Sequence, residues 1–222
     1  EISLGLVGSE MCIRDRRMQD EVITGIANLI ESRDGSTGLH VKNTQNYVQI
    51  LTKALREKGM YPDILDHNYE LNTVKASVLH DIGKIKTPDA ILLKPGRLTD
   101  EEFEVMKQHT VAGCEIIDRI IGNVEHEEYV DIARKIARYH HERWDGTGYP
   151  DGLSGEEIPL CARIMALADV FDALYQDRCY KKAIRPASKV FEIIKENSGS
   201  QFDPNLTEIF LELQREITDI SE

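Results

Sequence analysis

Apolar residues recur at intervals of three and four positions along almost the whole chain from about Arg17 onward. This spacing gathers apolar side chains on one face of an α-helix. Two clear examples are the segment with Val22, Ile26, Leu29 and Ile30 and the segment with Val48, Leu51, Ala54 and Leu55. No run of strand length alternates convincingly between apolar and polar residues, so the pattern predicts an all-α fold.

A long helix is predicted to begin after Thr99, because Thr99 and Glu102 have the spacing of a capping box. The last helix is predicted to begin at Asp203-Pro204, an N-cap followed by a first-turn proline. The helix after Thr99 would carry on one face Phe103, Met106, His109, Gly113, Ile117 and Ile120.

Other predicted helices end at, or contain, residues whose side chains can bind a metal ion or transfer a proton. A short apolar helix would end at His80-Asp81, with Gly83 as its C-terminal stop. A second would end at His140-His141, and a third would contain Asp169. The segment from Asp145 to Pro159 is rich in Gly and Pro and does not follow the helical pattern, so we expect a long irregular loop there. Long ordered loops are often functional.

The composition narrows the class of protein. The chain has 222 residues, of which 41% are hydrophobic, enough for the core of one large domain. Its 39 acidic and 27 basic side chains give a net charge of −12, which argues against binding to DNA or RNA polymers. No run approaches the about 20 apolar residues of a membrane span, so we expect no membrane contact in this fragment.

The cysteines point to a reducing, cytoplasmic setting. They show neither the spacing of a zinc knuckle nor that of a disulfide framework, and they are Cys12, Cys114, Cys161 and Cys179.

The first sixteen residues do not continue the helical pattern. They resemble translated adapter sequence, so we expect residues 1–16 to be a non-native segment, the alternative being a linker from an upstream domain. Residues 17–222 are then expected to form the functional domain.

A set of histidines and aspartates is the strongest chemical signal. Imidazole and carboxylate groups suit iron, manganese, zinc or cobalt, and a sufficient number of them can hold two ions with a shared water. Burying so many ionisable groups in a helical core is favourable only if cations balance them. The candidates are His40, His80, Asp81, His109, His140, His141 and Asp169. The other two histidines, His67 and His126, lie in acidic stretches and are expected at the surface.

The order of the motifs resembles that of the HD-GYP family of cyclic di-GMP phosphodiesterases, within the HD-domain superfamily of metal-dependent phosphohydrolases. The resemblance extends from about Glu31 to Leu206. It rests on the runs Val78 to Ile85, Lys94 to Thr99, His140 to Pro150 and Ala168 to Leu174. It implies an HD-domain-like helical bundle with the Gly- and Pro-containing loop near the active site, and it makes 17–222 the catalytic domain.

The resemblance also implies a metal centre. Asp81 would bridge two divalent ions, most simply Fe or Mn with Zn, Co or Ni as alternatives, and the other six candidates would complete their ligand shells. Some family members hold a third ion with a Glu four residues before the first histidine, where this chain has Ser36. A hydroxyl is a poor substitute for an anionic bridge, so we predict two ions.

The implied reaction is hydrolysis of one phosphodiester of cyclic di-GMP to linear pGpG, with continuation to GMP left open. A hydroxide shared by the two ions would be the nucleophile. Lys84 follows Asp81 by three positions and His80 by four, so it can point at the same site and neutralise a phosphate oxygen or assist the leaving 3′-oxygen. Asp81 and Lys84 are thus the predicted catalytic residues.

Substrate contacts are implied for six residues by the same resemblance. They are Asp34, Lys84, Tyr149, Asp172, Arg178 and Lys181. Arg178 can bind a phosphate with two hydrogen bonds, while Lys181 acts as a point charge. Cys179 stands where a proline is more common in the family, which departs from the expected turn.

Two other functions stay open from sequence. The metal chemistry could act on a different cyclic dinucleotide or nucleotide phosphoester, since a metal site recognises phosphate rather than the base. Alternatively, a non-catalytic module could sense cyclic di-GMP or bind partners such as cyclase-domain proteins, although such a module would be expected to lack ligands. Family members usually carry an upstream receiver or sensory domain, which this sequence does not show.

Overall fold

The computed structural model describes residues 21–34, 39–121, 127–176 and 183–220. The segment 1–16, Ser36, His126, Arg178 and Lys181 lie outside these ranges, and of Asp34 only the backbone is described. Predictions for these residues therefore stay predictions.

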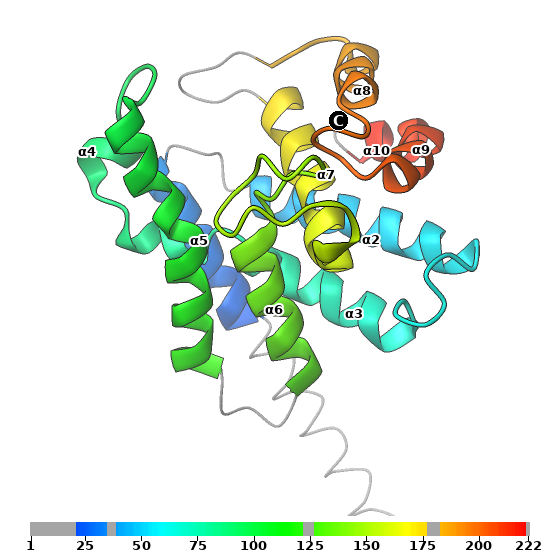
Figure 1. Cartoon of the computed structure of the whole chain (residues 1–222), viewed down its shortest axis with the longest axis horizontal. Helices are drawn as coiled ribbons and strands as arrows, with labels where there is room; N and C mark the ends of the chain where they lie inside the picture. Colours follow the sequence, from blue (N-terminus) through cyan, green and yellow to red (C-terminus); the bar gives the residue numbers. More distant parts are fainter. Residues whose placement is uncertain (1–20, 35–38, 122–126, 177–182, 221–222) are drawn as a thin grey trace, which may run out of the picture.

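Every named element of the described residues is helical, which confirms the all-α prediction (Figure 1). A helix at residues 21–31 comes first. It is followed by η1 (Ser32–Asp34), α2 (His40–Glu57), α3 (His67–Ala76), η2 (Ser77–Leu79), η3 (Ile82–Lys86), α4 (Asp89–Leu92), α5 (Asp100–Ile121), α6 (Glu127–Tyr139), η4 (Gly155–Glu157), α7 (Leu160–Tyr175), α8 (Ala187–Glu196), α9 (Pro204–Glu212) and α10 (Gln214–Asp219). Elements labelled η are short 3₁₀ helices.

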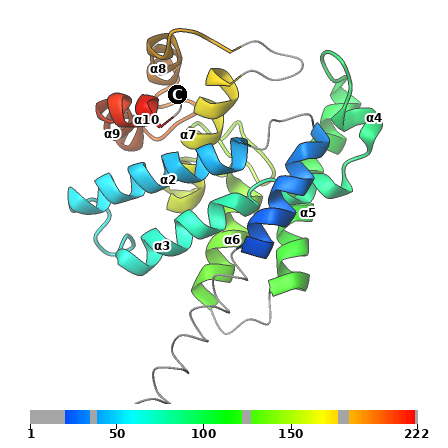
Figure 2. The ribbon, with the colours of Figure 1, turned by 180° about the vertical axis from the view of Figure 1, so that it is seen from behind.

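The core forms where α7 crosses α2 and packs against α6. In both views α5 and α6 lie side by side, α2 and α3 form a second pair, and α8 to α10 gather at the far end beside α7 (Figures 1 and 2). α7 is buried along most of its length. Fully buried side chains from these helices include Tyr47, Leu51, Ile136, Ile164 and Phe171. This packing brings the start of α2 beside the C-terminal half of α7, where His40 contacts Asp172.

The long helix α5 begins as the sequence predicts. The Thr99 backbone N–H donates to Glu102 Oε2 at 2.7 Å, and the Glu102 N–H donates to Thr99 Oγ1 at 3.3 Å. His109 and Ile117 are buried on its inner face, but Phe103 and Ile120 are 43% and 59% exposed, so the predicted stripe is exposed near both ends. The capping box matters because it sets where His109 falls on the helix.

The helix predicted to begin at Asp203-Pro204 is α9, but the prediction that it is the last helix was wrong, because α10 follows it. Asp203 accepts hydrogen bonds from the N–H groups of Asn205 and Leu206, at 2.8 and 3.4 Å, and thereby caps α9. Cys114 and Cys161, the two described cysteines, are free thiols. No helix among the described residues is both long and apolar enough to cross a membrane.

The segment around His80-Asp81 differs from the prediction. The α-helix ends at Ala76, and the chain continues through η2 and η3, with His80 and Asp81 in the short link between them. Gly83 is therefore not a helix stop. A Cβ at Gly83 would lie 1.8 Å from the backbone oxygen of His109, so glycine is needed because η3 touches α5 there. This contact places Asp81 next to His109.

Replacing Gly83 should therefore destabilise the whole domain. We expect Gly83→Ala to lower the free energy of unfolding by about 3 kcal/mol or more, since the clash is with backbone and overpacking typically costs 1–3 kcal/mol. Urea denaturation of metal-free protein measures this. Gly25→Ala is the matched control, because a Cβ there meets nothing within 4 Å and helical Ala is favoured over Gly by about 0.5–1 kcal/mol. Equal stability of Gly83→Ala and the wild type would contradict the close approach.

Candidate metal centre

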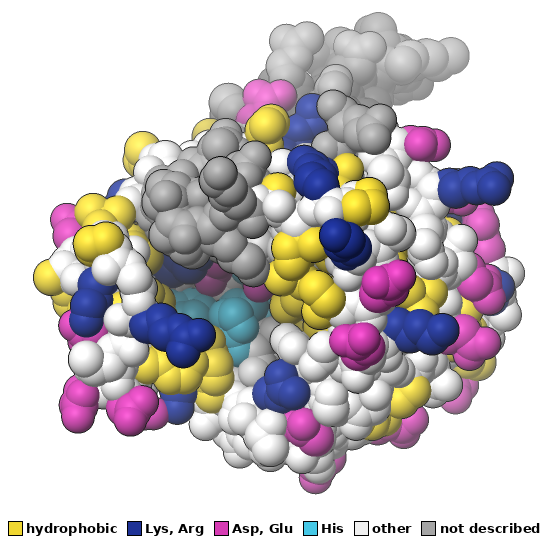
Figure 3. Space-filling view, turned by 90° about the horizontal axis from the view of Figure 1, so that it is seen from above, with side chains coloured by type: hydrophobic (Ala, Val, Ile, Leu, Met, Phe, Trp, Pro, Cys, Tyr) yellow, Lys and Arg dark blue, Asp and Glu magenta, His cyan; other side chains and the backbone are white. Residues whose placement is uncertain are grey.

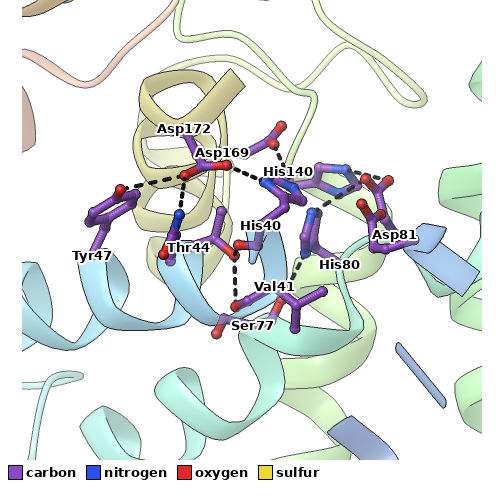
Figure 4. A network of polar contacts seen from close by, with 12 residues as sticks. His40, Val41, Thr44, Tyr47, Ser77, His80, Asp81, His140, Asp169 and Asp172 are labelled. Carbon is purple, nitrogen blue, oxygen red and sulfur yellow. Dashed lines mark hydrogen bonds and ion pairs between the residues drawn. The ribbon is translucent and has the colours of Figure 1, made fainter. Parts of the chain in front are cut away.

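The predicted ligands converge from separate segments of the fold. His40 is the first residue of α2, and His80 and Asp81 lie between η2 and η3. His109 lies in α5, Asp169 lies in α7, and His140 and His141 directly follow α6. In Figure 4 the rings of His40, His80 and His140 and the carboxylates of Asp81 and Asp169 point toward a common centre. Residues up to 129 positions apart in the chain are thus brought together (His40 and Asp169).

Four of the five histidine rings are fixed by a hydrogen bond at Nδ1. The acceptors are Asp172 Oδ2 for His40 (2.6 Å), Ser77 O for His80 (2.9 Å), Met106 O for His109 (2.7 Å) and Ile136 O for His140 (2.9 Å). A backbone carbonyl can only accept, so Nδ1 carries the proton and a neutral ring leaves the Nε2 lone pair free. Such bonds orient metal-binding histidines and select their tautomer.

The Nε2 atoms of these four rings are buried and have no hydrogen-bond partner within the described ranges. Buried polar atoms are almost always hydrogen-bonded, so four unbonded nitrogens in one place require an explanation. A divalent cation is the partner that suits several converging imidazole lone pairs. The site therefore fits divalent metal binding.

Asp81 lies between two groups of potential ligands. Its Oδ1 is 3.2 Å from His109 Nε2 and 3.7 Å from His140 Nε2, while its Oδ2 is 3.3 Å from His80 Nε2. Ligand atoms lie within 4.8 Å of one another in each of two groups that share Asp81. One group adds His109, His140 and His141, and the other adds Glu31, His40 and His80. One carboxylate thus faces both groups, which is the arrangement that a bridging ligand requires.

Burial and neighbouring charges have opposite effects on the pKa values of Asp81 and His80. Burial favours the neutral form of Asp81, but Lys84 and His80 outweigh it and hold the pKa of that carboxyl well below its usual range. Burial likewise opposes the charged form of His80, yet the carboxylates of Asp81, Asp169 and Glu31 raise its pKa to about 9. Burial lowers the pKa of His109 to about 4. At neutral pH without metal, His80 is therefore protonated while His109 is neutral.

Lys84 is close to Asp81, as the sequence predicts. Its Nζ lies 2.6 Å from Asp81 Oδ2 and 3.3 Å from Glu31 Oε1. The turn that brings it there is the 3₁₀ helix η3, in which the Lys84 N–H donates to the Asp81 carbonyl at 3.0 Å. The ammonium is thus held at the edge of the ligand cluster.

Asp172 and Glu31 make contacts that the sequence did not predict. Asp172 is 1% exposed, accepts from His40 Nδ1, and contacts Asn43 and Tyr47. These contacts favour a role in orienting His40 over the guanine contact that the resemblance implies. Glu31 was not predicted, although it lies four residues after buried Ala27, and a carboxylate at that helical spacing is a recognisable signal.

The loop from Asp145 to Pro159 is held by Glu142, another residue that sequence reasoning missed. Glu142 accepts hydrogen bonds from the backbone N–H groups of Asp151, Gly152 and Leu153, at 2.8 to 3.1 Å. A Cβ at Gly148 would lie 2.3 Å from the Arg143 nitrogen, so only glycine allows the loop to fold back on itself there. The loop is thereby fixed against the end of α6.

This loop places Tyr149 beside the histidines. The centroid of its ring lies 4.9 Å from that of His141 and 5.9 Å from that of Phe103. A cavity of about 280 Å³ opens there, and its lining includes Phe103, Lys107, His140, His141, Arg143 and Tyr149. Figure 3 shows histidines at the floor of a hollow bordered by Lys, Arg and hydrophobic side chains. The ligand cluster is therefore reachable from the surface.

The sequence is similar to an HD-domain family model and to several phosphodiesterases. Residues 26–206 match the family model described as HD domain. A cyclic di-GMP phosphodiesterase of Vibrio cholerae is 45% identical over 206 residues, covering 91% of this chain and 41% of that protein. A 3′3′-cGAMP-specific phosphodiesterase of the same species is 36% identical over 197 residues, covering 89% of this chain and 35% of that protein. The chain spans less than half the length of these two curated relatives.

A solved structure is also similar in fold. The crystal structure of a cyclic GMP-AMP specific phosphodiesterase of V. cholerae matches 90% of this chain and 52% of its own, with a TM-score of 0.59 at 19% identity. At that identity the likeness concerns the arrangement of helices alone.

The pKa of His80 predicts a pH dependence of metal binding. Because its pKa is about 9 in the metal-free protein, an ion that binds at Nε2 must displace a proton. We expect the affinity for Mn(II) to rise about tenfold per pH unit between pH 7 and 8.5, as displacement of one proton requires. Anaerobic calorimetric titration measures it, with His67→Gln as a control in an exposed histidine. An affinity independent of pH over this range would contradict the assignment of His80 to the ion.

Proposed function

The chain belongs to the HD domain family, and from this premise we propose that it is a metal-dependent phosphodiesterase that hydrolyses cyclic di-GMP to linear pGpG. The observation that carries the proposal is the buried Asp81 carboxylate, which faces two groups of histidines, four of whose Nε2 atoms have no hydrogen bond within the described ranges. The relative with 45% identity, a cyclic di-GMP phosphodiesterase, supports the choice of substrate. Continuation to GMP belongs to the same proposal.

Two divalent ions are proposed, with Asp81 as the ligand that they share. His109, His140 and His141 would hold one ion, and His40, His80 and Asp169 would hold the other. Fe or Mn is proposed because mixed imidazole and carboxylate donors suit them, with Zn, Co and Ni as alternatives. Such a pair supplies an activated water and stabilises charge on the phosphoryl oxygens.

Three side chains would support the reaction by supplying charge, by orienting a metal ligand or by contacting the substrate. Lys84 reaches the cluster through its ammonium, 2.6 Å from Asp81 Oδ2, so it can neutralise a phosphate oxygen or stabilise the leaving 3′-oxygen. Asp172 keeps the His40 ring in one orientation through its 2.6 Å hydrogen bond. Tyr149 lines the cavity beside His141, where its ring can contact a bound nucleotide.

Further substrate contacts are proposed for Asp34, Arg178 and Lys181 on the strength of the motifs alone. A substrate with two phosphates needs local positive charge on a chain whose net charge is −12. Arg178 and Lys181 would supply it. The motifs are also the basis for four further proposals. These are an upstream receiver or sensory domain, a cytoplasmic location, cyclase-domain partners and a catalytic domain that extends over 17–222.

A mixed cyclic dinucleotide is the second candidate substrate. One relative with 36% identity is a 3′3′-cGAMP-specific phosphodiesterase. The metal centre recognises phosphate, which both dinucleotides share, so discrimination must come from contacts to the bases. A test of function should therefore offer both substrates.

The test is anaerobic incubation of Fe(II)- or Mn(II)-loaded protein with cyclic di-GMP and, separately, 3′3′-cGAMP, with the products resolved by chromatography. We expect metal-dependent formation of pGpG or GMP. Asp81→Ala should reduce the rate at least about a hundredfold, because it removes the shared ligand of the charge-stabilising centre. A wild-type rate in Asp81→Ala would contradict the mechanism, and exclusive turnover of cGAMP would move the protein to the second substrate.

Arg178→Ala separates binding from chemistry in the same assay. Loss of the charge-assisted hydrogen bonds from its guanidinium to a phosphate should raise KM about tenfold or more with a smaller change in kcat. Arg119→Ala serves as the control because Arg119 is an exposed arginine of α5. An unchanged KM in Arg178→Ala would remove this residue from the proposed substrate site.

A further inference from the structure

Glu31 is a buried carboxylate beside the metal centre to which neither the motifs nor the relatives give a role. We propose that Glu31 is a direct ligand of the ion held by His40 and His80, so that this side of the centre is rich in oxygen donors. The inference rests on the proposed metal-dependent function, but it concerns ion binding and is tested without substrate.

The position of Glu31 is the first argument. It ends the helix of residues 21–31, and its side chain is buried, with the residue 3% exposed. One of its carboxylate oxygens lies within 4.8 Å of ligand atoms of His40, His80 and Asp81. Opposite ligands of an ion with bonds of about 2.0–2.2 Å are separated by roughly twice that length. Glu31 can therefore share one ion with these three residues.

The unbonded nitrogens of His40 and His80 are an independent second argument. Both residues are nearly fully buried, 4% and 0% exposed, and neither Nε2 has a hydrogen bond within the described ranges. Each ring is fixed from its other side, by Asp172 and by the Ser77 carbonyl. Two imidazole Nε2 atoms are thus aimed at the place where the carboxylates of Glu31 and Asp81 meet.

The contacts of Lys84 show where a cation is favoured. Its Nζ lies 2.6 Å from Asp81 Oδ2 and 3.3 Å from Glu31 Oε1, so one ammonium contacts both carboxylates. Buried carboxylates require a compensating cation. An ion that binds Asp81 and Glu31 together would take over this compensation and release Lys84 for a substrate phosphate.

The consequence is a centre with two unlike halves. Among the described side chains, the group with His109, His140 and His141 includes one carboxylate, that of Asp81, whereas the half with His40 and His80 would have Glu31, Asp81 and Asp169. Oxygen-rich donor sets favour Mn(II) over softer ions, while imidazole-rich sets also suit Zn(II). Glu31 lies in one group with His40, His80 and Asp81. It would therefore add a ligand to the ion proposed there and does not imply a third ion.

The test is an anaerobic Mn(II) titration of the full chain carrying Glu31→Gln, a substitution that keeps the shape and removes the charge. We expect one of the two binding steps to weaken at least about tenfold, the scale known for residues that support a metal, while the other step is unchanged. Glu21→Gln is the matched control, because Glu21 is exposed on the same helix. Thermal unfolding of both metal-free variants is the control for folding, and each should show a cooperative transition.

A double-substitution cycle with Lys84→Met distinguishes a ligand from a residue that only positions Lys84. If Glu31 is a ligand, Glu31→Gln still weakens the same step at least about tenfold in the Lys84→Met background, because the lost ligand does not depend on Lys84. If the weakening disappears there, or if Glu31→Gln leaves both steps unchanged in the wild-type background, the proposal is wrong. A chain that shows the Glu31-dependent step but does not hydrolyse either dinucleotide would refute the proposed function and leave this inference standing.

Discussion

The arrangement of the whole domain depends on the compensation of one buried charge. The Asp81 carboxylate is almost enclosed, and burial of a charge without a partner is strongly unfavourable. The protein surrounds it with Lys84 and with imidazoles whose buried Nε2 atoms find no hydrogen-bond partner in the described part of the chain. Divalent ions would satisfy the carboxylate and the imidazoles together. Metal binding would then be coupled to the stability of this core.

The helices supply the precision that such a centre needs. The close contact between η3 and α5 at Gly83 sets Asp81 beside His109, and the crossing of α2 by α7 sets His40 beside Asp169 and Asp172. The carbonyls that hold the Nδ1 atoms of His80, His109 and His140 belong to the same turns of chain as the histidines. The backbone conformation that places each ring also fixes its tautomer, so the ligands are ordered before any ion binds.

The sequence predicted the helical class, the capping box of α5 and the candidate ligands, because these follow from local spacing and from recognisable motifs. It did not predict Glu31 as a neighbour of the centre, the hydrogen bond from His40 to Asp172, or the way Glu142 holds the loop. Each of these depends on how distant helices pack, or on a side chain that folds back on a loop. The 3₁₀ turns around Asp81 were missed because the contact of Gly83 with α5, and not local propensity, determines them.

The most direct test of the central claim is anomalous diffraction from crystals of the Mn(II)-loaded protein, grown without oxygen. We expect two anomalous peaks, one on either side of the Asp81 carboxylate. One peak would lie against His109, His140 and His141, and the other against His40 and His80. A single peak, or two peaks that do not share Asp81, would show that Asp81 does not bridge two ions.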